Sequence, residues 1–244
     1  MRQLLPVPLD IDPLDAHAAA ARPAPAHRPW VALNMVTSTD GATAVAGVSG
    51  ALGGQADHQV FAAIRAVADV IVAAAGTIRA EGYGPPRPSD AAQAARVARG
   101  QAASPRIAVV SGSLDLDEHS SLFTEAVEPP LIFTVEQAPP DRVAALSPVA
   151  ELRVTGEARV DLAAMLQDLG TLGARCAVVE GGPVLNGQLL AIDLVDELNL
   201  TLAPVLVGGH SRRAIVGDDE TPRWMTLAHL WESDGELLAR YVRR

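Results

Sequence analysis

Residues 176–187 read Cys176-Ala177-Val178-Val179-Glu180-Gly181-Gly182-Pro183-Val184-Leu185-Asn186-Gly187, an apolar run that leads into two glycines and a proline. The run 176–179 is typical of a buried strand, and a helix is expected directly after it, over 184–191. Two glycines at such a junction let a ligand approach the backbone, and the helix that begins there presents free N–H groups to a phosphate. A tight turn without a ligand explains the same residues equally well.

The rest of the chain alternates strand-like apolar runs with segments of helical spacing. Ser233-Asp234-Gly235 stands between the last two runs, and Asp-Gly in that setting is a strong hairpin signal. We therefore predict an α/β fold with a mostly parallel central sheet and a C-terminal antiparallel hairpin. The expected strands are 30–36, 68–75, 106–110, 131–135, 151–154, 176–179, 194–203, 226–232 and 236–242, and the expected helices are 55–67, 141–146, 161–169 and 184–191.

Residues 1–28 are rich in Pro and Ala and lack strong periodicity, so they are expected to form an N-terminal arm that precedes the fold. Residues 29–244 show no dividing linker and no internal repeat, which predicts a single domain. Within it, 84–104 is expected to be a loop with one short Ala-rich helix. Cys176 is the only cysteine, and its apolar surroundings predict a buried structural thiol.

Composition narrows the function of this chain of 244 residues. All 19 basic residues are arginines, which excludes chemistry that needs a lysine, such as a P-loop or a pyridoxal phosphate Schiff base. The 29 acidic residues give a net charge of −10, which disfavours general binding to nucleic acid or to an anionic membrane. The histidines form no ligand pair typical of a metal site, and no signal peptide or long apolar run occurs. We expect no metal and a cytoplasmic location.

Two further strand ends carry residues suited to a ligand. In Gly76-Thr77-Ile78-Arg79, the arginine offers a fixed charge that can read the 2′-phosphate of NADP. A helix cap followed by a solvated arginine explains this motif as well. Ser38-Thr39-Asp40-Gly41 follows the strand 30–36, where α/β proteins place ligand contacts, although a plain Asp-Gly turn is the simpler explanation.

The motifs occur in a fixed order. They are Ser38-Thr39-Asp40-Gly41, Ser49-Gly50, Gly76-Thr77-Ile78-Arg79-Ala80-Glu81, Val179-Glu180-Gly181-Gly182 with Leu185-Asn186-Gly187, and a tail over 194–209 that ends in Val207-Gly208-Gly209. This ordered set resembles the pyrimidine reductase family of riboflavin biosynthesis, the bacterial reductase domain related to dihydrofolate reductase. The resemblance runs from about Arg28 to the C-terminus. Because no zinc deaminase domain precedes this region, the sequence resembles the stand-alone reductases of the family.

The resemblance implies a dihydrofolate-reductase-like fold with helices on both faces of the sheet. It implies NADPH as the cofactor and reduction of the ribose of 5-amino-6-(5-phosphoribosylamino)uracil to the ribityl form. The expected catalytic residues are Asp40 and Glu180, of which Asp40 would shape the active-site loop. Glu180 would be a proton source or hydrogen-bond acceptor, unless its carboxylate only caps the following helix.

The resemblance and the strand-end motifs together name the binding residues. The expected cofactor contacts are Thr37, Gly76, Thr77, Arg79, Glu81, Gly181, Gly182, Pro183, Val184 and Leu185. The expected substrate contacts are Ser49, Arg65, Arg87 and Glu180. Arg87 is a candidate partner of the substrate phosphate, whereas Arg65 is better explained as a solvated residue on a helix face.

Two other functions stay open at this point. One is reduction of dihydrofolate or another pterin, because the fold is shared, and the other is a non-catalytic NADPH-binding protein on the same scaffold. Asn34 stands where many family members have Lys, so a variant substrate also stays open. The resemblance implies a homodimer, for which the apolar segments 194–207 and 237–242 are the candidate interface.

Overall fold

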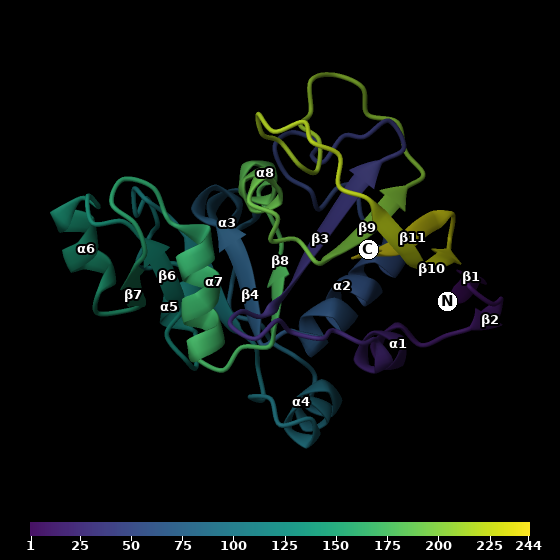
Figure 1. The fold of residues 1–244 in the computed structure, drawn as a ribbon, viewed down its shortest axis with the longest axis horizontal. Coiled ribbons are helices and arrows are strands. Elements are labelled where there is room, and N and C mark those ends of the chain that lie inside the picture. The colour runs from purple at the N-terminus through teal and green to yellow at the C-terminus, as the bar shows by residue number, and fades with distance from the viewer.

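The computed structural model describes residues 1–244, which form one eleven-stranded sheet flanked by helices (Figure 1). The strands are β1 (Arg2–Leu5), β2 (Leu9–Asp10), β3 (Trp30–Ser38), β4 (Val70–Ala74), β5 (Arg106–Val110), β6 (Leu131–Thr134), β7 (Glu151–Val154), β8 (Cys176–Val179), β9 (Glu197–Ala203), β10 (Met225–Ser233) and β11 (Glu236–Arg243). The helices are α1 (Pro13–Ala19), α2 (Gln55–Val67), α3 (Ala75–Glu81), α4 (Asp90–Ala98), α5 (Ser121–Thr124), α6 (Pro140–Leu146), α7 (Leu162–Thr171) and α8 (Pro183–Ala191).

The strand order is β2-β1-β10-β11-β9-β3-β8-β4-β5-β6-β7. All neighbours from β9 to β7 are parallel, whereas all neighbours from β9 to β2 are antiparallel. The prediction of a mostly parallel α/β sheet is therefore confirmed. The C-terminal hairpin of β10 and β11 is confirmed too, and Asp234 (φ 53°) and Gly235 (φ 82°) take the left-handed conformations that its tight turn requires.

The core lies on both faces of the sheet, as alternation along β3 shows. Ala32 packs on the face covered by α2 and α3, together with Ile64. Leu33 packs on the opposite face, against Met165 of α7 and Leu189 of α8. Successive side chains of a strand point to opposite faces, and burial on both faces explains why the central strands read as continuous apolar runs.

Helix α2 has the predicted bounds, 55–67, and side chains distant in sequence hold both of its ends. The carboxylate of Glu236 accepts the N–H of Gly54 at 2.8 Å, at the beginning of the helix. At its other end, the buried guanidinium of Arg96 donates to the carbonyl of Ala68 at 2.6 Å. Arg96 lies on α4, which is the short helix expected within 84–104. These contacts satisfy backbone groups that a helix leaves without internal partners.

Three predicted strands are shorter in the structure. The strand expected over 68–75 spans Val70–Ala74, and Ala75 already begins α3. The strand expected over 131–135 ends at Thr134. The strand expected over 194–203 begins at Glu197, although the preceding Asp196 still pairs with Val31: its backbone N–H donates to the carbonyl of Val31 at 3.0 Å, and its carboxylate accepts the N–H of Val31 at 2.8 Å.

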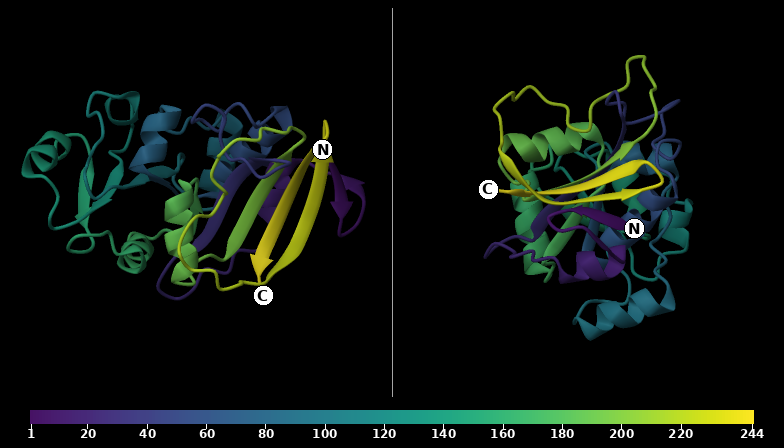
Figure 2. Two further views of the ribbon diagram at one scale, coloured as in Figure 1. Left: turned by 90° about the horizontal axis from the view of Figure 1, so that it is seen from above. Right: turned by 90° about the vertical axis from the view of Figure 1, so that its right-hand side faces the viewer.

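Residues 1–28 need a correction, because they are built into the fold instead of preceding it. β1 pairs antiparallel with β10 and extends the sheet by two strands, with β2 at its edge (Figure 2). Helix α1 buries His17, which lies edge-on to the ring of Trp231 at 5.2 Å between centroids. A strand of four residues is too short to show periodicity, and its pairing depends on a partner more than 200 residues away.

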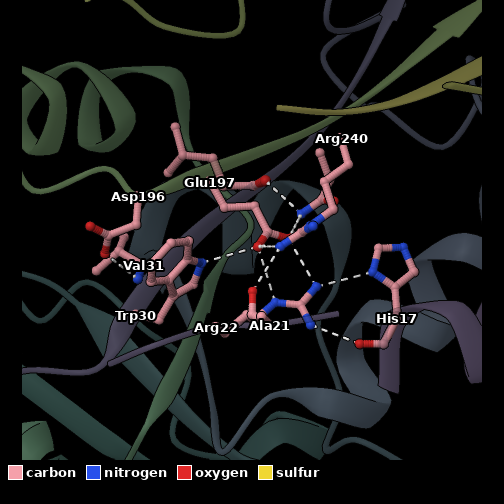
Figure 3. Close-up of polar contacts among 10 residues, drawn as sticks. His17, Ala21, Arg22, Trp30, Val31, Asp196, Glu197 and Arg240 are labelled. Atoms are coloured by element: carbon pink, nitrogen blue, oxygen red, sulfur yellow. Dashed lines mark hydrogen bonds and ion pairs between the residues drawn. The ribbon is translucent and has the colours of Figure 1, made fainter. Parts of the chain in front are cut away.

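The N-terminal segment is fastened to Glu197, whose side chain is fully buried (Figure 3). Its carboxylate accepts hydrogen bonds from Arg22 at 2.9 and 3.1 Å, from Arg240 at 2.8 Å and from the indole N–H of Trp30 at 3.0 Å. Burial by itself would raise the pKa of Glu197, but the hydrogen bond from Arg240 and the charges of both arginines lower it to about 2. Glu197 therefore carries its charge inside the protein.

Two histidines lie beside this cluster, and we expect them to lower the free energy of unfolding in mild acid. Burial, followed by the charge of Arg22, lowers the pKa of His17 to about 3, and burial lowers that of His229 to about 4. Because the unfolded chain binds these protons near pH 6.5 and the folded chain does not, stability is complete above that pH and falls below it. We expect a loss of about 2 kcal/mol per histidine between pH 7 and pH 5, measured by urea unfolding.

The control is His17→Gln, in which the slope of unfolding free energy against pH should fall by about one proton. His58→Gln serves as a second control, because His58 lies on the exposed side of α2. Equal slopes in the wild-type protein and in His17→Gln would contradict the prediction.

Candidate functional site

The three ligand-type motifs meet at one edge of the sheet. β3, β8 and β4 are adjacent and parallel, so their carboxyl ends lie side by side. The motif with Asp40 follows β3, the motif with Thr77 follows β4, and the motif with Glu180 follows β8. Ligands of open α/β sheets bind at the carboxyl ends of the strands, so this edge is the candidate site.

The glycine turn between β8 and α8 is held by the neighbouring strand. The carbonyl of Gly181 accepts the N–H of Ala74 at 2.8 Å. Gly181 has φ 90°, which favours glycine, and its peptide bond to Gly182 is cis. A Cβ on Gly182 would lie 3.1 Å from the hydroxyl oxygen of Thr77. No side chain caps the nine-residue helix α8, so its first N–H groups are free for an anion.

Glu180 is a buried carboxylate at this edge that accepts three hydrogen bonds. Its side chain is 2% exposed and forms a two-point ion pair with Arg65 of α2, with Nε–Oε1 at 2.7 Å and Nη2–Oε2 at 2.6 Å. The hydroxyl of Tyr83 donates to Oε2 at 2.6 Å. Glu180 therefore does not cap α8, and the interpretation of Arg65 as a solvated helix-face residue is wrong.

Aromatic rings hold the guanidinium of Arg65 in place. Its Cζ lies 4.2 Å from the ring centroid of Phe61 and 5.3 Å from that of Tyr83. Burial opposes the charge of Arg65, but the hydrogen bond and charge of Glu180 raise the pKa of this guanidinium above its ordinary value. Burial and the charge of Glu180 likewise raise the pKa of Tyr83. The arginine stays charged and the phenol keeps its proton.

Asp40 joins two loops at the same edge. Its carboxylate accepts the hydroxyl of Ser38 at 2.5 Å and the backbone N–H groups of Val207 and Gly208 at 3.1 and 2.7 Å. The hydrogen bond from Ser38, followed by those of the two N–H groups, lowers the pKa of Asp40 to about 2. Asp40 is thus ionised at neutral pH, which fits a residue that shapes a loop better than one that donates a proton.

Four other predicted residues lie near this edge. The carboxylate of Glu81 accepts the backbone N–H of Ser49 at 2.7 Å, which brings a cofactor candidate and a substrate candidate together. Arg79 donates to the carbonyl of Asp115 at 2.6 Å and also faces its carboxylate at 3.2 Å. Thr37 is buried at the end of β3.

Arg87 lies apart from the other substrate candidates. Its side chain is 74% exposed and is paired with Glu125, which is itself half exposed. Such exposed pairs exchange readily with solvent and contribute little to stability. The guanidinium is therefore available to a ligand, although the structure does not place it beside Glu180.

A long loop, 204–224, packs on the outer side of α8. The N–H of Val216 donates to the carbonyl of Pro183 at 3.0 Å, and the side chain of Asn186 donates to the carbonyl of Ala214 at 2.9 Å. Gly187 is required there, because a Cβ would lie 2.0 Å from the carbonyl oxygen of Val216. An open cavity of about 450 Å³ lies beside this loop, on the sheet face of Leu33 and away from Glu180.

Sequence reasoning missed Tyr83 and Phe61. In the sequence, Phe61 stands with Val60 and Ile64 at helical spacing, which indicates only the apolar face of a helix. Tyr83 stands outside every motif, and the one signal for it was Gly82, a glycine at the end of a helix. No group of His, Cys, Asp or Glu side chains is arranged to hold a metal ion, and no helix has the length and apolar character to cross a membrane.

The fold and this edge define a dihydrofolate-reductase-like α/β oxidoreductase. The model of the RibD C-terminal domain family matches residues 29–239, and the chain belongs to this family, the pyrimidine reductases of riboflavin biosynthesis. The predicted family and fold class are thereby confirmed. It is a family of NAD(P)H-dependent reductases.

Relatives and solved structures agree with this assignment. A 2,5-diamino-6-ribosylamino-4(3H)-pyrimidinone 5′-phosphate reductase of Methanothermobacter thermautotrophicus is 33% identical over 189 residues, which cover 78% of this chain and 84% of that protein. The protein of the same name from Aquifex aeolicus is 30% identical over 209 residues, covering 83% and 89%. A pyrimidine reductase-like protein from Corynebacterium diphtheriae has a TM-score of 0.86 and 27% identity, with 96% of this chain and 99% of that one covered.

Proposed function

We propose that this protein reduces the ribosyl group of a phosphorylated ribosylaminopyrimidine to the ribityl form, with NADPH as the reductant. The observation that carries the proposal is the placement of Glu180. A buried carboxylate, held at two points by Arg65, lies directly beside a glycine turn that opens a helix. The free N–H groups at the beginning of α8 suit a dinucleotide phosphate, and the carboxylate of Glu180 suits the N–H groups of a pyrimidine.

The glycine turn fits the cofactor. Gly182 has no side chain where a Cβ would meet the hydroxyl of Thr77 at 3.1 Å, so backbone and hydroxyl form a shallow cradle. The N–H groups at the beginning of α8 would hold a phosphate there, together with Thr77. Arg79 would bind the 2′-phosphate by leaving its exposed partner Asp115, so we expect NADPH to bind more tightly than NADH.

The chemistry needs little from the protein beyond binding and proton control. The bond between C1 and the ring oxygen of the ribosylamine breaks as the nitrogen lone pair forms a C=N bond, and the ring oxygen takes a proton from water. The nitrogen keeps its own hydrogen, and hydride supplied by the nicotinamide, when bound, would convert C1 of this iminium to the secondary amine of the ribityl product. Glu180 orients the pyrimidine by accepting an N–H, and the two hydrogen bonds from Arg65 fix the position of this carboxylate. Asp40 keeps the loop after β3 against the loop 205–209, which sets the shape of the pocket.

NADPH oxidation with three substrates tests the proposal. They are 5-amino-6-(5-phosphoribosylamino)uracil, its 2,5-diamino-pyrimidinone counterpart, and dihydrofolate. The names of the relatives favour the diamino form, whereas the resemblance of the motifs favours the uracil. Turnover of either ribotide well above that of dihydrofolate supports the proposal. Turnover of dihydrofolate alone would replace it with pterin reduction, and NADPH binding without any turnover would indicate a non-catalytic protein.

We predict that Arg87→Ala raises the KM of the ribotide 10- to 100-fold, about 1.4–2.8 kcal/mol, because it removes a cation that can bind the phosphate dianion. NADPH affinity and the KM of dihydrofolate, which has no phosphate, should change little. Arg159→Ala is the matched control, since Arg159 is also exposed. An unchanged KM for the ribotide would show that a residue other than Arg87 binds the phosphate.

The homodimer also remains a proposal. β9 and β11 are interior strands of the sheet, so an interface cannot form by edge pairing at either of them. Six of their half-buried residues share one face, which is the surface that a second copy would cover; they are Leu198, Leu200, Leu202, Leu237, Ala239 and Tyr241. Light scattering at about 25 kDa over a wide concentration range would argue against a dimer.

A further inference from the structure

Tyr83 reaches the site through a reversal of the chain. Helix α3 ends at Glu81, and Gly82 takes the left-handed conformation (φ 61°, ψ 48°). The N–H of Tyr83 then donates to the carbonyl of Ile78 at 3.1 Å, which turns the chain back along the helix. This turn brings the phenol ring beside Arg65 and its hydroxyl to Glu180.

The hydroxyl of Tyr83 completes the set of donors on one oxygen of Glu180. Each carboxylate oxygen can accept about two hydrogen bonds. Oε2 accepts Nη2 of Arg65 and the hydroxyl of Tyr83, both at 2.6 Å, whereas Oε1 accepts only Nε of Arg65, at 2.7 Å. Oε1 therefore keeps room for one more donor, and Oε2 does not.

We propose that Tyr83 is a positioning residue. Its hydroxyl occupies the second acceptor site of Oε2 of Glu180, so that Oε1 is the oxygen that accepts an N–H of the pyrimidine. The inference rests on the proposed function. Three side chains together then orient the pyrimidine. Arg65 fixes the plane of the carboxylate of Glu180, Tyr83 occupies Oε2, and Oε1 is left to accept the N–H of the ligand. The ligand class is a heterocycle with an N–H donor at its edge.

The ionisation of Tyr83 fits this role. Its phenol is the donor, so it must keep its proton over the pH range in which the enzyme works. Burial and the adjacent charge of Glu180 raise the pKa of Tyr83, so the hydroxyl stays protonated even in mildly alkaline solution.

Ultraviolet titration tests the hydrogen bond without any turnover. The chain has two tyrosines, Tyr83 and Tyr241, so the difference between the wild-type protein and Tyr83→Phe reports Tyr83 alone. We expect Tyr83 to ionise above pH 10, the ordinary value of a tyrosine, in the wild-type protein, and at lower pH in Glu180→Gln, which removes the adjacent charge. Ionisation of Tyr83 near pH 10 in the wild-type protein would overturn the proposal.

Steady-state kinetics test the positioning role. Tyr83→Phe should lower kcat/KM for the ribotide about 10-fold, because the carboxylate loses one of its three bonds. NADPH affinity should stay the same. Tyr241→Phe, the control, should equal the wild-type enzyme in both respects.

The outcomes separate this inference from the function on which it rests. If the wild-type enzyme reduces neither ribotide, the proposed function fails and the substrate role of Tyr83 fails with it. If the wild-type enzyme is active and folded Tyr83→Phe matches it in kcat/KM for the ribotide, only the role of Tyr83 is overturned. A merely structural role would lower stability and leave kcat/KM of the folded variant unchanged.

Discussion

Gly182→Val is expected to weaken NADPH binding at least 100-fold, about 2.8 kcal/mol or more. A Cβ at this position lies 3.1 Å from the hydroxyl oxygen of Thr77, and the two methyl groups of valine would fill the space between the glycine turn and α3. The φ of Gly182 is −71°, a conformation that any residue can adopt, so the substitution does not strain the backbone. The valine side chain instead occupies the space in which the cofactor phosphate would bind.

Calorimetry with NADPH measures the effect, and Gly182→Ala is the graded control. Alanine adds only the Cβ, which the hydroxyl of Thr77 can accommodate by moving a few tenths of an ångström, so its loss of affinity should be much smaller. Thermal unfolding of both variants shows whether they are folded. A folded Gly182→Val protein that binds NADPH as tightly as the wild type would place the cofactor phosphates elsewhere.

Glu197→Ala is expected to lower the free energy of unfolding by about 3–5 kcal/mol. The substitution removes the only carboxylate that faces the buried guanidinium groups of Arg22 and Arg240. Both cations would remain in the interior without a counter-charge, and the indole N–H of Trp30 would lose its acceptor. The N-terminal segment should then separate from the sheet first, since Arg22 fastens it there.

Urea unfolding measures this loss, with Glu125→Ala as the control for a surface pair. Glu125 is half exposed and its partner Arg87 is mostly exposed, so its removal should cost less than about 1 kcal/mol. Proteolysis of the native Glu197→Ala protein should cut between residues 1 and 28 before any other segment. Equal stability of the two variants would show that the buried cluster contributes no more than a surface pair.

The elements of the central sheet were predictable because their signals are local. The buried strands read as continuous apolar runs, α2 was placed at its observed bounds, and Asp234-Gly235 marked the hairpin. The glycine turn at 181–182 was visible for the same reason, since a strand, two glycines and a helix follow one another within a dozen residues. The order of these motifs pointed to the family.

The partners of the site residues were not predictable from local patterns. Glu180 and Arg65 are 115 positions apart, and Tyr83 is 97 positions from Glu180. A carboxylate after a strand can cap a helix, bind a ligand or pair with an arginine, and its sequence neighbours do not distinguish these outcomes. Only the packing of α2 and the turn after α3 against the end of β8 brings the three side chains together.

By itself, therefore, the sequence determined the strands from β3 to β11, most of the longer helices, the class of the fold and the glycine turn at the strand end, because hydrophobic spacing and turn residues act over short distances. The tertiary structure alone decided that residues 2–22 belong to the sheet and core, through Arg22 and Glu197, which are 175 positions apart. It also decided that Glu180 is an ion-paired acceptor and not a helix cap. In both cases a charged side chain is buried, which is stable only when a side chain of opposite charge lies beside it. That partner is more than 100 positions away in the sequence, so no local pattern of residues predicts the pair.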